Sequence, residues 1–542
     1  MSNGHWPFYL KIDGEILRGA MISRLEIRQQ LGDHSWCELD FRLLEEQRPP
    51  IADYLGKPLQ FLTFEEYTTE WPIFDGFVLE AELEYGLHGD FVAKLRAVTK
   101  SYFLQLTPEE DYFYQKDLRE VAEKITGEDG VTLEFSADGE LAKMNYVQWG
   151  ESDFDFLRRL ADDQGCVVRP TATGIEIQRG FHDTGLTLAW HADYGLTSFS
   201  LKGKLGQPKF EGTCYDPRTM ESRSFHQIHQ EPRFFPATAT EMIEAVTTQS
   251  EQLPSSRLIF DGRAPKLESY QKLLEKESAR AIGATVTAVG VSRHVRLLPG
   301  DKVHLEGSGF DAQGDYGLIQ VIHRYDQTQG YRNEFLATPW MDYTHAQQPV
   351  PSRISGVVPA RVASHNDPRG MGRVQIQYDW MEGRQTAWAR MSMPNAGAGR
   401  GIMFMPEIGD EVLVTFEHGD PERPYIIGAV WNGVASAPRH GFWEQEGTEA
   451  VGSNSTQVAR DMARNDIKRI VTKSGNMIEF VDVEGKESLV LTTPGGQKIQ
   501  MLDHCIETGG RQILCLDSPG DILINAKGRL HMRSQYFSRE VG

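Results

Sequence analysis

The sequence predicts a mainly β protein built from small barrels and ending in a ribbon of short strands. Segments such as residues 23–29 and 91–98 alternate apolar and polar side chains between turns, a period typical of half-buried antiparallel strands. The 542 residues include 52 glycines and 26 prolines with no low-complexity tract, which is enough turn-forming residues to separate many short strands. Residues 467–542 repeat a unit of one glycine turn and one short alternating strand.

The N-terminal half of the chain combines strands of this kind with helices. We expect strands at residues 8–17, broken at Gly14, and at 23–29, 36–43 and 91–98. Apolar residues at helical spacing predict helices over about 117–126, closed by Gly127, and 153–164, begun by Ser152 and closed by Gly165. A third helix is expected at about 266–281.

Charge and composition exclude several classes of protein. With 77 acidic and 56 basic side chains the formal net charge is −21, which disfavours nucleic-acid binding. The sequence has no apolar run long enough for a membrane helix and no secretory signal pattern at its start. Five cysteines lie far apart without a C-x-x-C motif, so we expect buried reduced thiols in a protein folded in the cytoplasm.

The repeats point to self-association. Ser474-Gly-Asn-Met-Ile recurs as Pro494-Gly-Gly-Gln-Lys-Ile, with Ile478 and Ile499 in equivalent places, a pattern typical of a β-helix. A narrow ribbon from one chain has nothing against which to bury its apolar face. The repeat therefore predicts intertwining with copies of the same chain in a cyclic oligomer. Similar turns at Gly300-Asp301 and Gly409-Asp410 suggest two barrel units upstream.

Two motifs resemble the VgrG family, the spike proteins of type VI secretion that are related to contractile phage tail hubs and spikes. The first is Gln148-Trp-Gly-Glu-Ser-Asp-Phe-Asp-Phe-Leu-Arg-Arg-Leu, and the second runs from Gly372 through Trp388 to Gly433. The signature residues carried by this resemblance are Gln148, Glu151, Ser152, Asp153, Phe156, Arg159, Leu160, Gly372, Arg373, Val374, Trp388, Gly397, Gly399, Gly401, Pro406, Gly409, Asp410, Val412, Gly419, Asp420, Pro421, Pro424, Gly428, Asn432 and Gly433.

The resemblance implies four regions. Residues 1–345 would form a phage tail hub-like domain of two related β-barrels with inserted helices, and 353–433 an OB-fold barrel. Residues 434–466 would be a linker, and 467–542 a triple-stranded β-helix needle formed by a homotrimer. We expect no lysozyme-like insertion between the hub and the needle, and no catalytic domain after the needle.

The implied function is mechanical. The trimer would cap an Hcp-like tube and puncture a target membrane, contacting baseplate proteins and carrying a PAAR-type tip protein and effector cargo. The chain would assemble in the cytoplasm and leave through the contractile machine without a signal peptide. The final residues, with Tyr536 and Phe537, are the expected tip contact. One alternative is the hub of a phage or phage-like particle, and another is a secreted polysaccharide-active β-helix enzyme.

A search for reaction chemistry favours a non-enzymatic protein without cofactor or metal. There is no G-x-S-x-G, H-E-x-x-H or Walker A motif. His226 and His229 fit solvated histidines better than a metal site, and Glu151, Asp153 and Asp155 are explained by electrostatics at a helix start. The glycines of residues 395–401 precede strands, so a phosphate cradle is disfavoured. We expect Gly399 to allow close approach of chains around a three-fold axis.

Overall fold

The computed structural model describes most of the chain. The described residues are 8–17, 21–42, 50–65, 69–85, 91–137, 139, 141–190, 195–206, 209–216, 220–227, 236–250, 255–259, 267–307, 311–340, 353–381, 383–435, 466–484, 487–502, 513–519, 521–522 and 529. They fall into two compact units, residues 1–430 and 431–542. The expected linker at 434–466 and the expected tip contact at Tyr536 and Phe537 lie almost wholly or wholly outside the described residues.

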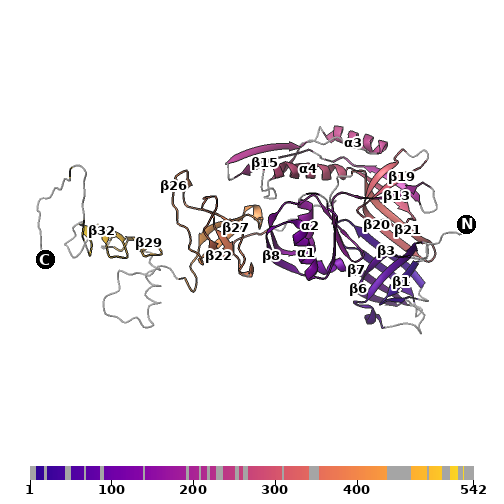
Figure 1. The fold of residues 1–542 in the computed structure, drawn as a ribbon, viewed down its shortest axis with the longest axis horizontal. Helices are drawn as coiled ribbons and strands as arrows, with labels where there is room; N and C mark the ends of the chain where they lie inside the picture. Colours follow the sequence, from indigo (N-terminus) through magenta and orange to yellow (C-terminus); the bar gives the residue numbers. More distant parts are fainter. Residues whose placement is uncertain are drawn as a thin grey trace. The chain divides into compact units, whose positions relative to one another are not determined.

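The hub is organised around one sheet of 13 strands (Figure 1). Eleven strands follow the order β14-β18-β21-β20-β3-β4-β7-β6-β5-β1-β2, and β13 joins through β19, which pairs with β20. Their bounds are β1 Phe8–Ile12, β2 Glu15–Ile16, β3 Met21–Gln30, β4 Trp36–Arg42, β5 Pro58–Glu65, β6 Thr69–Tyr85, β7 Phe91–Thr99, β13 His182–Ala189, β14 Leu196–Gly203, β18 Val286–Ser292, β19 Asp301–Glu306, β20 Gly314–Asp326 and β21 Gly330–Thr338.

The two expected hub barrels are therefore two curled parts of a continuous sheet. The antiparallel pair β20–β3 joins them, with Val321 opposite Gln29, while each part keeps its own apolar core. At this seam buried His323 contacts the Tyr331 hydroxyl through Nδ1 at 2.6 Å and Gln29 Oε1 through Nε2 at 3.2 Å. Burial lowers the pKa of His323 to about 3, so the seam holds a neutral imidazole.

A helical insertion follows β7. Its helices are α1 Leu118–Glu128 and α2 Asp153–Asp163, its short helix is η3 Lys100–Gln105, and its strands are β8 Pro108–Lys116, β9 Thr132–Phe135, β10 Met144–Ser152, β11 Val167–Pro170 and β12 Gly174–Gln178. Asp117 and Glu120 form a capping box at the start of α1. The expected closure at Gly127 is wrong: the helix continues to Glu128 and the left-handed residue is Gly130. Gly165 does have positive φ after α2, as expected.

A second insertion carries two further helices beside a three-stranded sheet (Figure 1). Its elements are β15 Phe210–Asp216, β16 Glu221–Gln227, α3 Ala237–Ser250, β17 Ser256–Ile259 and α4 Leu267–Gly283. Helix α4 matches the expected third helix closely. The sequence did not predict α3, because four threonines among its fourteen residues weaken the helical signal. Ala239 and Ile243, one turn apart and buried, hold it in place.

Residues 358–429 form a small open barrel. Five strands run in the order β23-β22-β27-β28-β24, and β25 and β26 form a separate hairpin. Their bounds are β22 Val358–Ser364, β23 Gln375–Gln377, β24 Arg390–Met391, β25 Ala396–Gly397, β26 Arg400–Gly401, β27 Glu411–Phe416 and β28 Pro424–Ala429. The barrel also contains two short helices, η4 Asp379–Met381 and η5 Glu417–Gly419. A further short helix, η2 Ile51–Tyr54, belongs to the hub. Val412, Val414 and Ile426 are fully buried in the barrel core.

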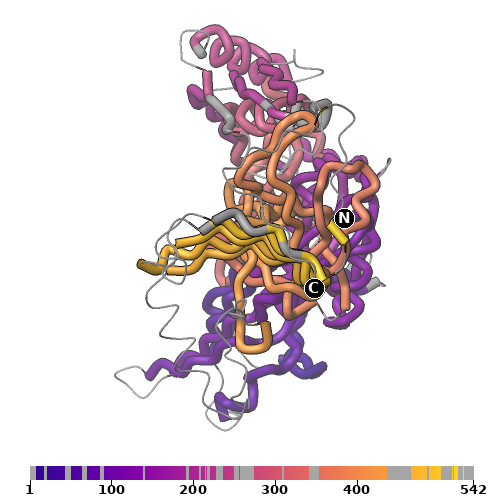
Figure 2. Tube along the Cα trace, turned by 90° about the vertical axis from the view of Figure 1, so that its left-hand side faces the viewer, coloured from indigo at the N-terminus to yellow at the C-terminus, as the bar shows by residue number. Residues whose placement is uncertain are grey.

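The C-terminal unit contains one antiparallel meander, drawn in yellow in Figure 2. Its strands are β29 Ile467–Val471, β30 Met477–Val481, β31 Ser488–Thr492, β32 Lys498–Leu502 and β33 Ile513–Asp517. The expected repeat of turn and strand is confirmed, since Ile478 lies in β30 and Ile499 in β32. The β-helix formed by three chains stays a prediction.

Two further findings concern the described residues. No helix in this part of the chain combines the length and apolar character needed to cross a bilayer. Cys37 and Cys166 are free and buried, and burial raises the pKa of both thiols. Cys505 lies outside the described residues, and Cys214 and Cys515 are placed only by their strands, β15 and β33.

Candidate functional site

The first signature motif forms the start of α2. Ser152 caps the helix by accepting a hydrogen bond from the Asp155 backbone N–H at 3.2 Å. Buried Gln148 donates to Asp153 Oδ1 at 2.7 Å and to the Glu151 carbonyl at 3.1 Å. The expected placement of Asp153 and Asp155 in the first helical turn is confirmed. Phe156 and Leu160 are fully buried in the core of the insertion.

Glu151 has a different role from the one expected. It forms a buried ion pair with Arg159, two turns along α2, with Arg159 Nη2 at 2.6 Å from Glu151 Oε1 and Nε at 3.3 Å from Oε2. Arg159 Nη2 also donates to the Val147 carbonyl at 3.0 Å. The pair therefore ties α2 back to β10, whereas helix-start electrostatics would have required no such partner.

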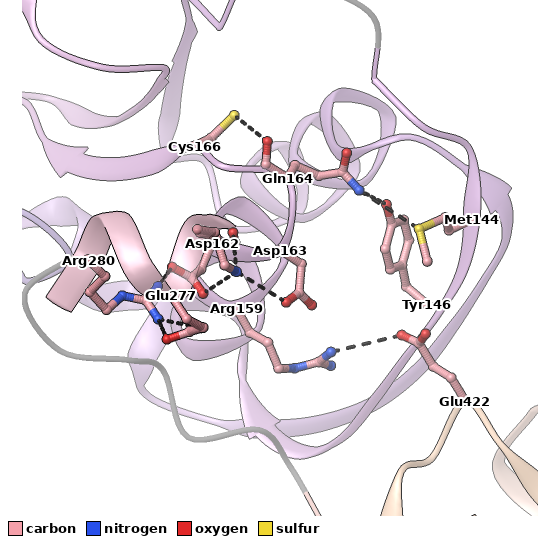
Figure 3. A network of polar contacts seen from close by, with 11 residues as sticks. Met144, Tyr146, Arg159, Asp162, Asp163, Gln164, Cys166, Glu277, Arg280 and Glu422 are labelled. Atoms are coloured by element: carbon pink, nitrogen blue, oxygen red, sulfur yellow. Dashed lines mark hydrogen bonds and ion pairs between the residues drawn. The ribbon is translucent and has the colours of Figure 1, made fainter. Parts of the chain in front are cut away.

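A second carboxylate reaches Arg159 from the barrel (Figure 3). Glu422 Oε1 lies 3.9 Å from Arg159 Nη1, and the Glu422 backbone N–H donates to Asp420 Oδ1 at 2.9 Å. Burial, with the nearby carboxylates of Asp420 and Asp163, raises the pKa of Glu422 to about 8. One guanidinium thus faces two carboxylates, and burial favours the protonated form of the second of them.

Aromatic packing joins the hub to the barrel around this ion pair. The ring of Trp149, from the signature motif, lies 5.7 Å from Tyr378, 5.7 Å from Trp380 and 6.2 Å from Phe416. Tyr112 and Val147 of the hub belong to the same buried cluster as the barrel core. Arg384 of the barrel adds an ion pair to Asp111 and donates to the Tyr112 carbonyl at 3.1 Å. Strands β8 and β10, with Arg159 of α2, thereby form the docking surface for the barrel.

The other end of α2 anchors α4. Asp162 accepts from Arg280 and from Lys276, the latter at 3.0 Å, and Arg280 also pairs with Glu277 at 2.8 Å (Figure 3). All four side chains are nearly buried. Asp163 also lies 4.0 Å from Lys276, so two cations face three carboxylates in a network that links the two helical insertions.

In the barrel, Arg373 organises the loop before β23. Its guanidinium binds Asp367, with Nη2 at 2.6 Å from Oδ1, and Asp367 also accepts from the backbone N–H groups of Arg369, Met371 and Arg373. The hydrogen bonds from the Arg373 guanidinium, with those from the backbone, hold the pKa of Asp367 well below its usual range. The guanidinium lies 5.9 Å from the ring of Trp388, a second signature residue.

The remaining signature residues are structural parts of the barrel and its turns. The glycines Gly372, Gly399, Gly401, Gly409 and Gly419 have positive φ. Val374 and Val412 are buried in the core.

The two similar Gly-Asp turns differ in their contacts. Asp410 caps its own turn by accepting a hydrogen bond from Glu407 N at 2.8 Å, whereas Asp301 accepts one from Arg169 of β11. Gly397 lies in β25, Pro424 and Gly428 in β28, and Pro406 O accepts from His365. Pro421 is buried, and Asn432, next to Gly433, accepts from two backbone N–H groups.

Gly399 has an explanation within the chain. It occupies the turn of the β25–β26 hairpin with φ of +65°, and a Cβ there would meet nothing within 4 Å. The backbone conformation by itself favours glycine. Close approach of three chains at this position stays a prediction. The next element after the hairpin is strand β27, so the expectation that strands follow these glycines is confirmed.

One trio has the composition of a hydrolase site. Ser136 Oγ lies 3.1 Å from His182 Nε2, and Glu176 Oε1 lies 3.4 Å from the same nitrogen. In a catalytic triad the acid and the nucleophile bind opposite ring nitrogens. Here both contact one nitrogen, and Arg169 neutralises Glu176 at 2.7 Å. This arrangement cannot relay a proton from serine to an oriented base.

The described residues also contain no cluster of three or more metal-ligating side chains. His226 lies on β16 with its side chain largely exposed, 3.7 Å from Glu211, and His229 lies outside the described residues.

The C-terminal meander has one strongly apolar face. The strand register aligns Ile470, Ile478, Leu491, Ile499 and Leu516 in one row across the five strands. Phe480, Leu489 and Met501 continue that face in the next row, beside Lys468. Five of these eight apolar side chains are 41–50 % exposed. The unit therefore displays its apolar surface to the outside.

Comparison with known proteins finds relatives that match the hub and the barrel. Residues 35–174 match the family model of the phage tail baseplate hub, and residues 358–431 match that of the type VI secretion system/phage-baseplate injector OB domain. The type VI spike protein VgrG5 of Pseudomonas aeruginosa is 31 % identical over 334 residues, 54 % of this chain. The chain therefore resembles the VgrG spike family in both its hub and its OB domain.

Other VgrG proteins extend the similarity along the chain. VgrG1b of Pseudomonas aeruginosa is 23 % identical over 532 residues, covering 89 % of this chain and 66 % of VgrG1b. The chain spans only 40 % of the length of VgrG5. A solved Francisella PdpA–VgrG complex shares the fold, with a TM-score of 0.57 at 10 % identity over 94 % of this chain and 88 % of that one.

The sequence located the VgrG motifs but missed how they meet. Glu422 follows the signature pair Asp420-Pro421, yet nothing in the sequence connects it with Arg159, more than 260 positions earlier. Trp149 could have indicated the docking contact from the sequence, because a large aromatic residue next to a charged helix start is typical of a packed interface.

Proposed function

We propose that this chain acts as a homotrimeric puncturing spike of a contractile injection machine. It would cap an Hcp-like tube, contact baseplate proteins and carry a PAAR-type tip protein and effectors toward a target cell. Similarity to VgrG spike proteins along most of the chain supports the general role. The energy for puncture would come from the machine, so the spike needs stiffness and no active site of its own.

The observation that carries the proposal is the apolar face of the C-terminal meander. Eight apolar side chains lie on one face, and five of them are 41–50 % exposed within one chain. An exposed face of this kind marks an interaction surface. Each copy of the ribbon has the same apolar rows, so three chains can bury these rows in a shared core. The strand edges of one chain can then form backbone hydrogen bonds with those of its neighbours. This is the β-helix needle that the repeats predict.

Native mass tests the assembly. One chain weighs 61.2 kDa, so the wild-type full chain is expected at about 184 kDa for a trimer. Met501→Asp places a charge on the apolar face and is expected to shift the mass toward 61.2 kDa. Ser474→Asp is the matched control, because it adds the same charge in the exposed turn between β29 and β30. A well-folded wild-type monomer would overturn the proposal.

Partners separate the spike from its alternative. A hub of a phage or extracellular phage-like particle would use the same trimer and the same needle. Pull-down of the wild-type trimer with Hcp-like tube and PAAR-type tip proteins from a type VI cluster supports the type VI machine. Binding only to tail-tube proteins of a particle would support the alternative. Export of the chain would then be measured in cells with and without an intact contractile sheath.

A further inference from the structure

The hairpin of the barrel belongs to an exposed arm, residues 394–404. Every residue of this arm is exposed, and its β25–β26 pair consists of two residues on each side. A hairpin this short is marginal without support from elsewhere. In Figure 1 the label β26 lies at one margin of the barrel, away from β22 and β27.

The arm also carries three consecutive exposed apolar side chains. Ile402 is 45 % exposed, Met403 75 % and Phe404 54 %. Exposed apolar runs of this length mark a contact surface, and methionine and aromatic residues are enriched in such contacts. The only charged side chain among residues 394–404 is Arg400. The arm is therefore an apolar strip with one positive charge at its hairpin.

The turn that follows the arm has the complementary character. Ile408 is 63 % exposed and stands beside exposed Glu407. Apolar surface with a carboxylate here matches apolar surface with a guanidinium on the arm. Within one chain both surfaces stay exposed, so they do not cover each other. A ring of identical chains brings unlike surfaces of neighbouring copies together at each contact.

We propose that the arm of one chain packs on the residue 406–410 turn of the neighbouring copy. This inference rests on the proposed trimer and assigns it a contact outside the needle. An acidic copy of net charge −21 also suits the cationic arm better than a basic partner would. The arm would lock the three barrels together at the base of the spike.

Site-specific cross-linking tests the contact in the full chain. A photoreactive amino acid at position 403 is expected to join two copies, with the cross-link mapped to the peptide that contains residues 406–410. The same label at Met371, an apolar residue 40 % exposed on another loop of the barrel, is the matched control and is expected to give no such product.

Charge reversal provides a second measurement. Arg400→Glu is expected to raise the concentration at which the trimer dissociates about tenfold, and Arg400→Glu with Glu407→Arg to restore it. An intact trimer without the cross-link at 403 would overturn the arm contact and leave the spike proposal standing. A cross-link that maps only to a tip or effector protein would likewise overturn it. A monomeric wild-type chain would overturn both.

Discussion

Arg159 Nη1 of the hub helix α2 lies 3.9 Å from Glu422 Oε1 of the OB domain. The same guanidinium already forms a buried ion pair with Glu151 at 2.6 Å. The side chains of Arg159 and Glu151 are 11 % and 9 % exposed, so Glu151 depends on Arg159 for its charge partner. This shared arginine connects the two domains that the family models identify separately, and it makes their junction sensitive to mutation and pH.

Removing the guanidinium should destabilise the hub strongly. Arg159→Met leaves Glu151 buried without its partner, and breaking a buried pair in this way costs about 3–5 kcal/mol. The double variant Arg159→Met with Glu151→Gln removes both charges and is expected to recover most of the loss. The free energy of unfolding in urea, followed by circular dichroism, measures both. Equal losses in the single and the double variant would contradict a buried-charge effect.

The pH dependence of the junction should follow Glu422. Burial raises its pKa from 4.5 to about 8, so between these values the folded state binds the proton and the unfolded state does not. The contribution of Glu422 to stability then falls as pH rises through this window and is greatest below pH 4.5. Glu422→Gln cannot ionise and is expected to lose less stability than the wild type between pH 5 and pH 9.

The comparison of variant and wild type isolates this group. The buried histidines His34 and His323, with pKa values lowered to about 4 and about 3, act in the opposite sense. They are neutral in the folded state and take up protons on unfolding, so they reduce stability as pH falls below 6.5. Because both proteins contain them, the difference in urea midpoint at each pH reports Glu422. Parallel pH profiles would contradict its assignment.

The sequence was most informative where local patterns decide the structure. Alternation located β3, β4 and β7, and Ser152 and Gly165 marked the ends of α2, because these signals act over a few residues. It failed at Gly127 and at α3, where packing of Ala239 and Ile243 outweighs a weak helical propensity. Contacts such as Arg159 with Glu422, and the pairing of β20 with β3, depend on chain topology and leave no local pattern.

Trp149 should control the coupling of hub and barrel. Its partly buried ring packs on Tyr378, Trp380 and Phe416, and truncating a packed aromatic residue costs up to about 3–5 kcal/mol. Trp149→Ala is therefore expected to split unfolding of residues 1–430 into separate hub and barrel transitions in calorimetry. Trp149→Tyr, which keeps an aromatic ring at this position, should keep a single transition. Identical calorimetric traces for Ala and wild type would refute the docking role.

Asp367 should determine the order of the loop before β23. Its carboxylate binds the Arg373 guanidinium and accepts three backbone N–H groups over residues 369–373. Asp367→Asn keeps the shape but removes the charge, and we expect a loss of about 1.5–3 kcal/mol, as for hydrogen bonds to charged groups. Faster amide hydrogen exchange should appear at residues 369–373 and not in β27. The exposed neighbour Arg369→Ala is the matched control, since only its backbone contacts Asp367; if it accelerates exchange as much as Asp367→Asn, the carboxylate does not organise the loop.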